Sequence, residues 1–343
     1  MEAMNAAFKK LFGQRPNYLL VAIAGASLAV LVVELILVAP RALEAWHPYD
    51  YGQYLEMGAA ARQGINPVGP RHYYPLPTIL WLFVPLSLMP DWFRLVWVIL
   101  PFIFILRLFR RSSLWLLFFT PLWFAVGDGM IDPWLIVPVT WVSENRPTRA
   151  ALGAVLLLMK PQVALLLVAY RLGYWVYTRD KRNLMTFILA LAVFCLPAFV
   201  FDPLWIPHLL TVLPLRVSET TAWVPLMTST IWAWWHLGDI GIWIFAALLV
   251  AFAILSWRAW SHESQRAAAL FQILNQAFVP VLYASNLVTL LPVMRNRKIL
   301  PFIVALSLGA MLLDRIMNTF GGGYVLIPLV MVYFSGRGIS YEA

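Results

Sequence analysis

Charged side chains are scarce: Asp, Glu, Lys and Arg make up 12% of the 343 residues, about half the usual share in soluble proteins. Apolar runs fill most of the chain, which argues against a large soluble core and predicts an all-α polytopic membrane protein. The only cysteine, Cys195, excludes a disulfide framework. The sequence has no phosphate-binding loop, dinucleotide fingerprint, G-x-S-x-G elbow or H-E-x-x-H motif, so a soluble nucleotide-driven mechanism is unsupported.

Acidic residues are outnumbered, with 16 Asp and Glu against 25 Lys and Arg and a net charge of +9. In a soluble chain that excess would suggest nucleic acid. Here the basic residues stand mostly at the ends of hydrophobic segments, where they orient helices and contact anionic headgroups. Lys9, Lys10 and Arg15 precede the apolar stretch 18–38, which predicts a retained anchor with a cytoplasmic N-terminus. We therefore expect a multi-pass protein of the cell (plasma) membrane, with no nucleic-acid partner.

The order of apolar runs predicts one membrane domain over 1–343, with no soluble domain. We expect about 11–13 transmembrane helices, with outer-face juxtamembrane helices and re-entrant segments. The run 75–90 holds four prolines, so it is interpreted as interfacial or re-entrant. The predicted spans that follow it are 92–109, 114–126, 133–143, 184–201, 239–257, 299–313 and 323–334, and 224–237 is too short to cross. Alternation places the C-terminus in the cytoplasm.

Two stretches are basic at both ends and are predicted to fold as helical hairpins. The stretch 150–178 breaks at Lys160-Pro161, and 267–294 turns near Tyr283-Ala-Ser-Asn286. A single helix would place one of each pair of basic clusters outside. Several legs are shorter than the roughly 20 residues that cross a bilayer. Half-helices are tolerated only where they line a protein cavity, so we expect a cavity open to the outer leaflet.

The first outer loop, residues 40–91, carries a carboxylate between tyrosines at Tyr49-Asp50-Tyr51. Asp50 could be a solvated loop acid or a helix cap. It could also be a general base, which must reach an acceptor hydroxyl and keep its charge, helped by nearby cations. Tyr54 falls on the same helical face by i,i+4 spacing.

A second candidate is Lys160, which interrupts an apolar run. A lysine there is costly unless it is paired or faces water, although its ammonium could also snorkel to the interface. A lipid phosphate would compensate its burial, and Gln162 could add a hydrogen bond. Arg62, Arg71 and His72 could complete a phosphate site, or position the loop at the headgroups.

Two further acids stand in the sequence GDGMID between predicted spans. Asp128 and Asp132 could orient Lys160, contact sugar hydroxyls or cap the next helix, and capping is favoured for Asp132. Asp50 and Asp128 could jointly take a divalent cation, but no spacing requires one, and the histidines lack ligand spacing. We therefore expect no obligatory metal or cofactor.

These motifs resemble the first outer loop and later signatures of glycosyltransferase family 87. The resemblance rests on Asp50-Tyr-x-x-Tyr54, Ala60-x-x-x-Gly64, Asn66-Pro67, Tyr74-Pro-Leu-Pro-Thr, Pro85-Leu-x-x-Met-Pro90, Gly127-Asp128-Gly129 and Leu158-Met159-Lys160-Pro161-Gln162, with an echo from Tyr283 to Pro292 that includes Asn286. The family comprises polyprenyl-phosphate-mannose-dependent mannosyltransferases of the GT-C fold group. The resemblance implies a GT-C-like bundle in which Asp50 matches the catalytic carboxylate and Lys160 the Lys-Pro motif.

The resemblance implies inverting transfer of a sugar, mannose first, from a polyprenyl-phosphate donor to a lipid or glycan acceptor. The expected substrate contacts around Asp50 are Lys160, Arg62, Arg71, His72, Tyr54, Gln162, Asp128 and Asn286. Two alternatives stay open. A lipid or polyprenyl transporter predicts paired intramembrane charges and related halves, neither of which the sequence shows. A non-catalytic subunit of a membrane complex would instead have protein partners.

Overall fold

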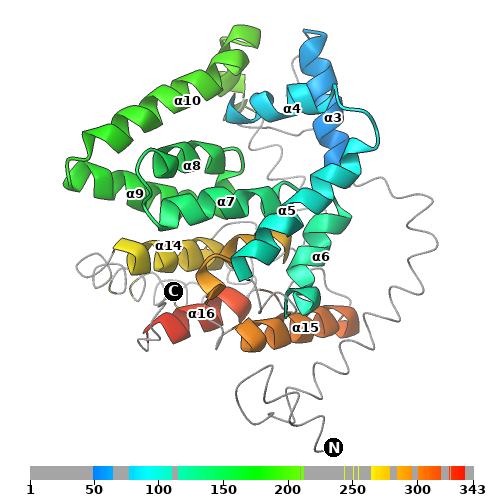
Figure 1. The fold of residues 1–343 in the computed structure, drawn as a ribbon, viewed down its shortest axis with the longest axis vertical. Helices are drawn as coiled ribbons and strands as arrows, with labels where there is room; N and C mark the ends of the chain where they lie inside the picture. Colours follow the sequence, from blue (N-terminus) through cyan, green and yellow to red (C-terminus); the bar gives the residue numbers. More distant parts are fainter. Residues whose placement is uncertain are drawn as a thin grey trace, which may run out of the picture.

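The computed structural model describes residues 49–64, 77–109, 115–208, 210–211, 243, 250, 254, 264–278, 284–295, 300–317, 324 and 326–336. All regular elements in these ranges are helical. They are α3 (Tyr49–Arg62), η1 (Pro77–Ile79), α4 (Leu80–Leu86), α5 (Phe93–Phe109), α6 (Thr120–Gly127), α7 (Asp132–Ser143), α8 (Arg149–Leu157), η3 (Pro161–Val163), α9 (Leu165–Tyr177), α10 (Lys181–Phe201), α14 (Ser264–Phe278), η4 (Ala284–Leu290), η5 (Val293–Arg295), α15 (Leu300–Met317) and α16 (Leu326–Gly336). Figure 1 shows α3, α4 and α10 at one end of the molecule and α15 and α16 at the other.

The predicted all-α class agrees with the described elements. The expected spans at 92–109, 133–143 and 184–201 correspond to α5, α7 and α10. The span expected at 114–126 is shorter than predicted, because α6 starts only at Thr120. Pro121 stands in its first turn, where the missing N–H costs nothing, so the chain begins a helix there instead of running through it. Two predicted segments lie outside the described residues, namely the span 18–38 and the short segment 224–237. Of the predicted span 239–257, only residues 243, 250 and 254 are described.

One described helix, α10, is long and apolar enough to cross a membrane, over Lys181–Val200. Its apolar side chains, including Leu189, Val193 and Leu196, are largely exposed rather than packed inside the protein. Exposed apolar surface on this scale suits lipid better than water. Two shorter apolar helices, Leu165–Tyr177 and Leu300–Leu313, fall below the spanning length.

The break at Lys160-Pro161 is confirmed. α8 ends at Leu157, the chain winds through η3, and α9 resumes at Leu165. A residue before proline is pushed out of the helical region, and Lys160 has φ −141° and ψ 76°. The second predicted hairpin is also interrupted, by η4 and η5 after α14. Its predicted apex begins outside the described residues at Tyr283, but Ser285 and Asn286 lie in η4.

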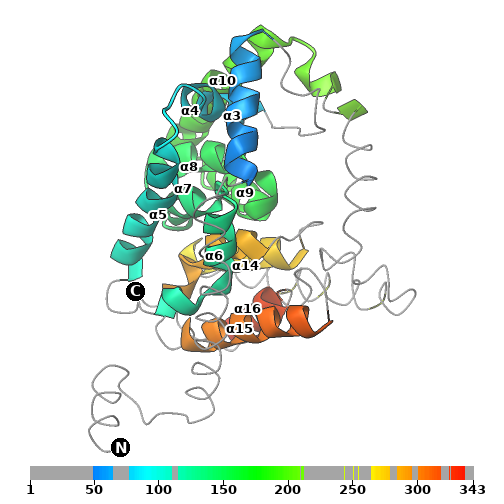
Figure 2. The same cartoon turned by 90° about the vertical axis from the view of Figure 1, so that its right-hand side faces the viewer.

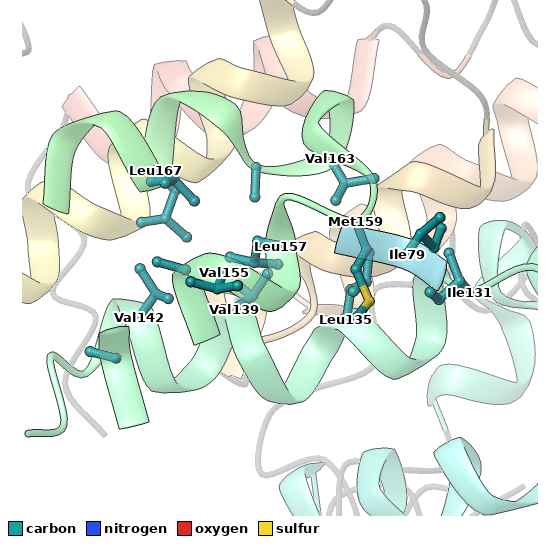
Figure 3. Packing of buried hydrophobic residues seen from close by; sticks show 14 of the residues in the cluster. Ile79, Ile131, Leu135, Val139, Val142, Val155, Leu157, Met159, Val163 and Leu167 are labelled. Atoms are coloured by element: carbon teal, nitrogen blue, oxygen red, sulfur yellow. The ribbon is translucent and has the colours of Figure 1, made fainter. Parts of the chain in front are cut away.

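Helices α7 and α8 pack closely at the centre of the first hydrophobic core. Val139 and Val142 of α7 meet Val155 and Leu157 of α8 in a cluster that continues to Val163 (Figure 3). All of these side chains are buried. A close-packed interior of this kind holds the ends of both helices in place. Those ends carry the polar residues described next.

Helix α3 packs against α4 through a close backbone contact (Figure 2). A Cβ built on Gly58 would lie 2.0 Å from the carbonyl oxygen of Phe83, so only glycine fits there. The Tyr54 ring stacks on the Phe83 ring with centroids 4.7 Å apart. The contact fixes the position of α3 and of the acid in its first turn.

Candidate functional site

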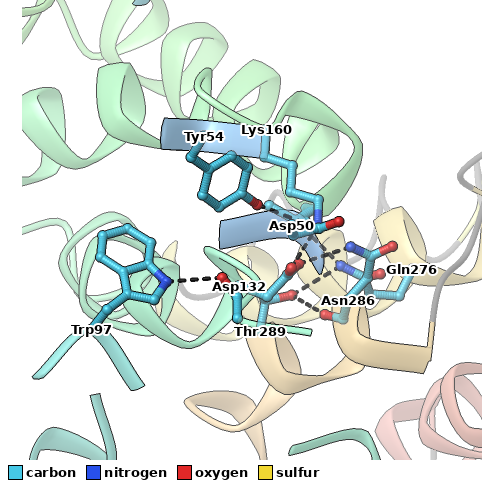
Figure 4. A network of polar contacts seen from close by, with 10 residues as sticks. Asp50, Tyr54, Trp97, Asp132, Lys160, Gln276, Asn286 and Thr289 are labelled. Carbon is cyan, nitrogen blue, oxygen red and sulfur yellow. Dashed lines mark hydrogen bonds and ion pairs between the residues drawn. The ribbon is translucent and has the colours of Figure 1, made fainter. Parts of the chain in front are cut away.

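Asp50 lies in the first turn of α3, where its side chain is half-buried. Its backbone N–H donates to the carbonyl oxygen of Asp128 at 3.0 Å, so α3 begins directly against the loop that follows α6. The Tyr54 hydroxyl donates to Asp50 Oδ2 at 3.4 Å, as the i,i+4 spacing predicts. Trp97 Nε1 donates to the carbonyl oxygen of Gly129 at 2.8 Å and fixes the same loop (Figure 4).

A buried ion pair stands beside Asp50. Lys160 Nζ donates to Asp132 Oδ2 at 2.5 Å, and Asn286 Nδ2 donates to Asp132 Oδ1 at 2.8 Å. The Asp132 residue is 0% exposed and Lys160 9%. Three separate parts of the chain therefore meet here: the start of α7, the break after α8 and η4 (Figure 4).

The preferred interpretation of Asp132 as a helix cap is wrong. The N-terminal capping residue of α7 is Ile131, which makes no side-chain capping bond, and Asp132 is the first helical residue. Its carboxylate faces Lys160 and Asn286 instead. A fully buried carboxylate requires a cation and a hydrogen-bond donor, and these two side chains supply them. Of the three roles considered for Asp132, orienting Lys160 is the one the geometry matches.

The pKa of Asp50 is raised from 3.8 to about 6. Burial is the main cause, because it removes water from the carboxylate. Lys160 opposes the rise, Asp132 and Asp128 add to it by like-charge repulsion, and the Tyr54 hydrogen bond lowers it slightly. Burial also raises the pKa of Asp128. A carboxylate with a pKa near 6 is ionised at neutral pH yet accepts a proton more readily than an exposed aspartate.

The site is mainly acidic, since two other carboxylates, those of Asp128 and Asp132, act on Asp50 against the one ammonium of Lys160. Lys160 is already paired with Asp132, so its charge is largely balanced before any ligand arrives. The geometry therefore favours a role for Lys160 in stabilising the carboxylates of Asp50 and Asp132 over its expected role as the main phosphate anchor. Paired buried charges, which the sequence did not reveal, are present.

The other expected contacts are spread more widely. Arg62 is exposed at the opposite end of α3, twelve residues from Asp50, which is about 18 Å along a helix axis. Gln162 lies in η3 beside Lys160, and its backbone carbonyl accepts from Asn275 Nδ2 at 2.7 Å. Arg71 and His72 lie outside the described residues. The structure thus brings Tyr54, Lys160, Asp128 and Asn286 to Asp50 and its neighbours, and leaves Arg62 apart.

Sequence reasoning missed three carboxamides of α14 that adjoin this site. Gln272, Asn275 and Gln276 are all buried in a helix whose other buried side chains are alanine, leucine and isoleucine. Their signal was available: amides at i, i+3 and i+4 within an apolar hairpin leg mark a polar face turned towards protein.

The fold and the site together define a helical protein with a buried, mainly acidic polar centre. No family model matches the chain, and neither a curated protein nor a solved structure matches it. Among the described residues there is also no group of three or more His, Cys, Asp or Glu side chains placed to hold a metal ion.

Proposed function

We propose that the chain is an integral membrane glycosyltransferase in which Asp50 is the general base. The sugar, with mannose as the first candidate, would pass from a polyprenyl-phosphate donor to a lipid or glycan acceptor on the extracytoplasmic face. The observation that carries the proposal is the setting of Asp50. It is a partly accessible carboxylate with a pKa near 6, beside a buried Lys160–Asp132 pair. Perturbed acids of this kind cluster at functional sites.

The reaction would proceed by one in-line displacement. An Asp50 carboxylate oxygen takes the proton from the acceptor hydroxyl as that oxygen bonds to the anomeric carbon. The bond between the anomeric carbon and the donor phosphate oxygen breaks, and its electron pair leaves with the polyprenyl phosphate. Attack from the face opposite the phosphate inverts the anomeric configuration. The scheme needs no metal ion, because phosphate is already a competent leaving group.

Lys160 would act on Asp50 and on the site as a whole. Its ammonium favours the ionised form of Asp50, which is the form that accepts a proton. Its bond to Asp132 fixes its position, so this support requires no rearrangement during the reaction. The donor phosphate would then draw its cations chiefly from Arg71 and His72 of the same outer loop.

The membrane setting is part of the proposal. The exposed apolar surface of α10 supports insertion in lipid, and a prenyl chain would lie between such helices. We propose a multi-pass arrangement in the plasma membrane with both termini in the cytoplasm. The short helices beside the Lys160 break support a site enclosed by protein at membrane depth, because irregular backbone there occurs only where protein or a cavity surrounds it.

A transporter is the second candidate, and the Lys160–Asp132 ion pair is the observation that favours it. Paired buried charges are typical of ion-coupled carriers. The two candidates differ in what they do to the lipid. A glycosyltransferase releases polyprenyl phosphate and a glycosylated acceptor, whereas a carrier moves its substrate unchanged.

Purified protein in lipid nanodiscs, given radiolabelled polyprenyl-phosphate mannose and a membrane lipid extract as acceptor, tests the proposal. Wild-type protein should transfer label. Asp50→Asn should lower the rate at least about a hundredfold, the scale of general-base catalysis, while donor binding stays within about twofold because the phosphate contacts lie elsewhere.

Glu56→Gln is the matched control for that substitution. It makes the same acid-to-amide change on the exposed side of the same helix, six residues from Asp50. Its transfer rate should stay near that of wild type. An Asp50→Asn protein that transfers sugar at the wild-type rate would contradict the assignment.

A further inference from the structure

Helix α14 presents three buried carboxamides on one face. Gln272 and Gln276 are 0% exposed and Asn275 is 3% exposed. Their i, i+3 and i+4 spacing places them side by side along the helix. Burying an amide costs free energy unless its hydrogen bonds are replaced, so what these side chains bind is informative.

The two glutamines hold the same pair of oxygen atoms. Gln272 Nε2 donates to the Val163 carbonyl at 2.9 Å and to Thr289 Oγ1 at 3.0 Å. Gln276 Nε2 donates to the same two atoms at 2.6 Å and 3.0 Å. Asn275 extends the contact, because its Oδ1 accepts from the Leu166 N–H at 2.9 Å.

These acceptors belong to the two irregular segments that build the acidic centre. Val163 closes η3, three residues after Lys160. Thr289 lies in η4, and its hydroxyl donates to the carbonyl oxygen of Asn286 at 2.7 Å. Lys160 and Asn286 are the two residues that hold the Asp132 carboxylate. Figure 4 shows Gln276 and Thr289 directly beside this group.

We infer that Gln272, Asn275 and Gln276 are positioning residues, which clamp η3 to η4 so that Lys160 and Asn286 meet on Asp132 beside Asp50. Broken helices have few hydrogen bonds of their own to keep their shape, so an outside clamp sets where Lys160 stands. The inference rests on the proposed function for its catalytic meaning, but the placement of Lys160 can be measured without turnover.

The cost of the arrangement argues that position, rather than stability alone, is its purpose. The Oε1 atoms of Gln272 and Gln276 are buried and accept no hydrogen bond among the described residues. Each such atom gives up the hydrogen bonds that it makes to water in the unfolded chain, which destabilises the folded protein. Apolar side chains would fill the same space without that cost. Partly satisfied buried networks in native proteins are found where a polar arrangement serves a site.

The test uses the proton affinity of Asp50 as a measure of where Lys160 stands. The charged or titratable groups that influence Asp50 are Lys160, Asp132, Asp128 and Tyr54. The affinity follows from thermal unfolding between pH 4 and 8, comparing each background with and without Asp50→Asn. Because the two glutamines share their acceptors, Gln272→Met or Gln276→Met alone should change little.

The double variant Gln272→Met/Gln276→Met should raise the pKa of Asp50 by roughly half a unit or more, because Lys160 no longer stands where it favours the carboxylate. Thr289→Val is a smaller change that removes the shared hydroxyl and its bond to Asn286, and it should shift the pKa in the same direction. It keeps the test valid if the double variant does not fold.

Asn183→Ala is the control for general loosening. Asn183 is buried too, and its Oδ1 accepts from the Thr148 N–H at 3.0 Å, joining α8 to α10 at a different place. It should destabilise the protein while the pKa of Asp50 stays near that of wild type. An unchanged or lowered pKa in both Thr289→Val and the double variant overturns the inference. If wild-type protein shows no transfer activity, that result would instead count against the proposed function alone.

Discussion

Asp50 is the residue at which function and stability oppose each other. Folding takes the carboxylate out of water and places it near Asp132 and Asp128, so ionising it costs more in the folded protein than in the unfolded chain. Lys160 and Tyr54 recover part of that cost. A general base is useful only if it is both accessible and ready to take a proton, and this setting provides both.

Asp50→Asn should therefore stabilise the protein near neutral pH. The pKa of Asp50 is raised when folded, so its contribution to stability is fully present below the unfolded value of 3.8 and is lost as the pH rises through about 6. A shift of about 2 units corresponds to at most about 3 kcal/mol. Unfolding of both proteins at pH 4 and pH 7.5 should show little difference at the lower pH and a clear gain for the variant at the higher. Equal stability at both values would show that Asp50 is not perturbed.

Transfer activity should depend on the same ionisation. Below pH 6 Asp50 is protonated and cannot act as a base, so the rate should fall about tenfold per pH unit towards acid. Saturating donor and a stable detergent-free bilayer isolate this effect from binding. A rate that stays constant down to pH 4.5 would assign the base elsewhere.

At the scale of elements, broken helices deliver the site. The Lys160-Pro161 break between α8 and α9 and the η4 segment after α14 both supply a polar side chain to Asp132. Pro161 causes the first break, because proline lacks the N–H that a helix interior needs and its ring clashes with the preceding turn. The break gives Lys160 a non-helical backbone conformation, and its side chain reaches Asp132 from there. Arg171 illustrates a related solution within α9: it is buried, and its guanidinium donates to the Val142 and Ser143 carbonyls at the end of α7.

The contact between α3 and α4 should be sensitive to a single methyl group. In Gly58→Ala the new Cβ would meet the Phe83 carbonyl at 2.0 Å, so backbone must move. We expect a loss of about 1–3 kcal/mol or more in the free energy of unfolding, and lower transfer activity because α3 carries Asp50. Denaturant unfolding and the nanodisc assay measure the two effects.

Gly52 provides the comparison on the same helix, because a Cβ there meets nothing within 4 Å. Gly52→Ala should leave the protein as stable or up to about 1 kcal/mol more stable, since alanine favours a helix. If both substitutions have the same effect, the close approach of α3 and α4 does not hold Asp50 in place.

At the scale of the whole molecule, the exposed apolar helices define how the protein meets its surroundings. Residues such as Ile188, Leu189 and Val200 on α10 are more than half exposed. The described part of the protein thus has an apolar core that encloses one polar centre, and it carries large apolar side chains on its outer surface as well. Exposed apolar surface of this extent suits a lipid environment.

Because Cys195 is the only cysteine in the chain, the orientation of α10 can be tested by labelling. In a Cys195→Ala background, Arg182→Cys places a single thiol in the first turn of α10, and Thr211→Cys places one ten residues after its end at Phe201. A membrane-impermeant maleimide should label Thr211→Cys in intact cells and Arg182→Cys only after permeabilisation. Labelling of both from one side would show that α10 does not cross the bilayer.

Local chemistry decides which features of this protein can be predicted from sequence alone. The all-helical character follows from long apolar runs, the break at Lys160 from the proline after it, and the Tyr54–Asp50 contact from their spacing on one helix. Each depends on residues close together in the chain. The prediction of a span over 114–126 missed the late start of α6, because it followed the length of the apolar run and gave too little weight to Pro121, which marks the start of the helix.

The partner of Lys160 was decided only by the tertiary structure. Asp132 is 28 residues away from Lys160 and 154 from Asn286, and several other acids and amides had equally suitable chemistry. Which of them met depended on the packing of α7 against α8 and on the α14 carboxamides that hold η3 and η4 together. Charge and hydrogen-bonding capacity belong to each side chain and can be seen in the sequence. The surroundings of low polarity exist only after distant segments have packed together and excluded water, and they are the reason why Asp132 needs Lys160 and why the pKa of Asp50 is raised.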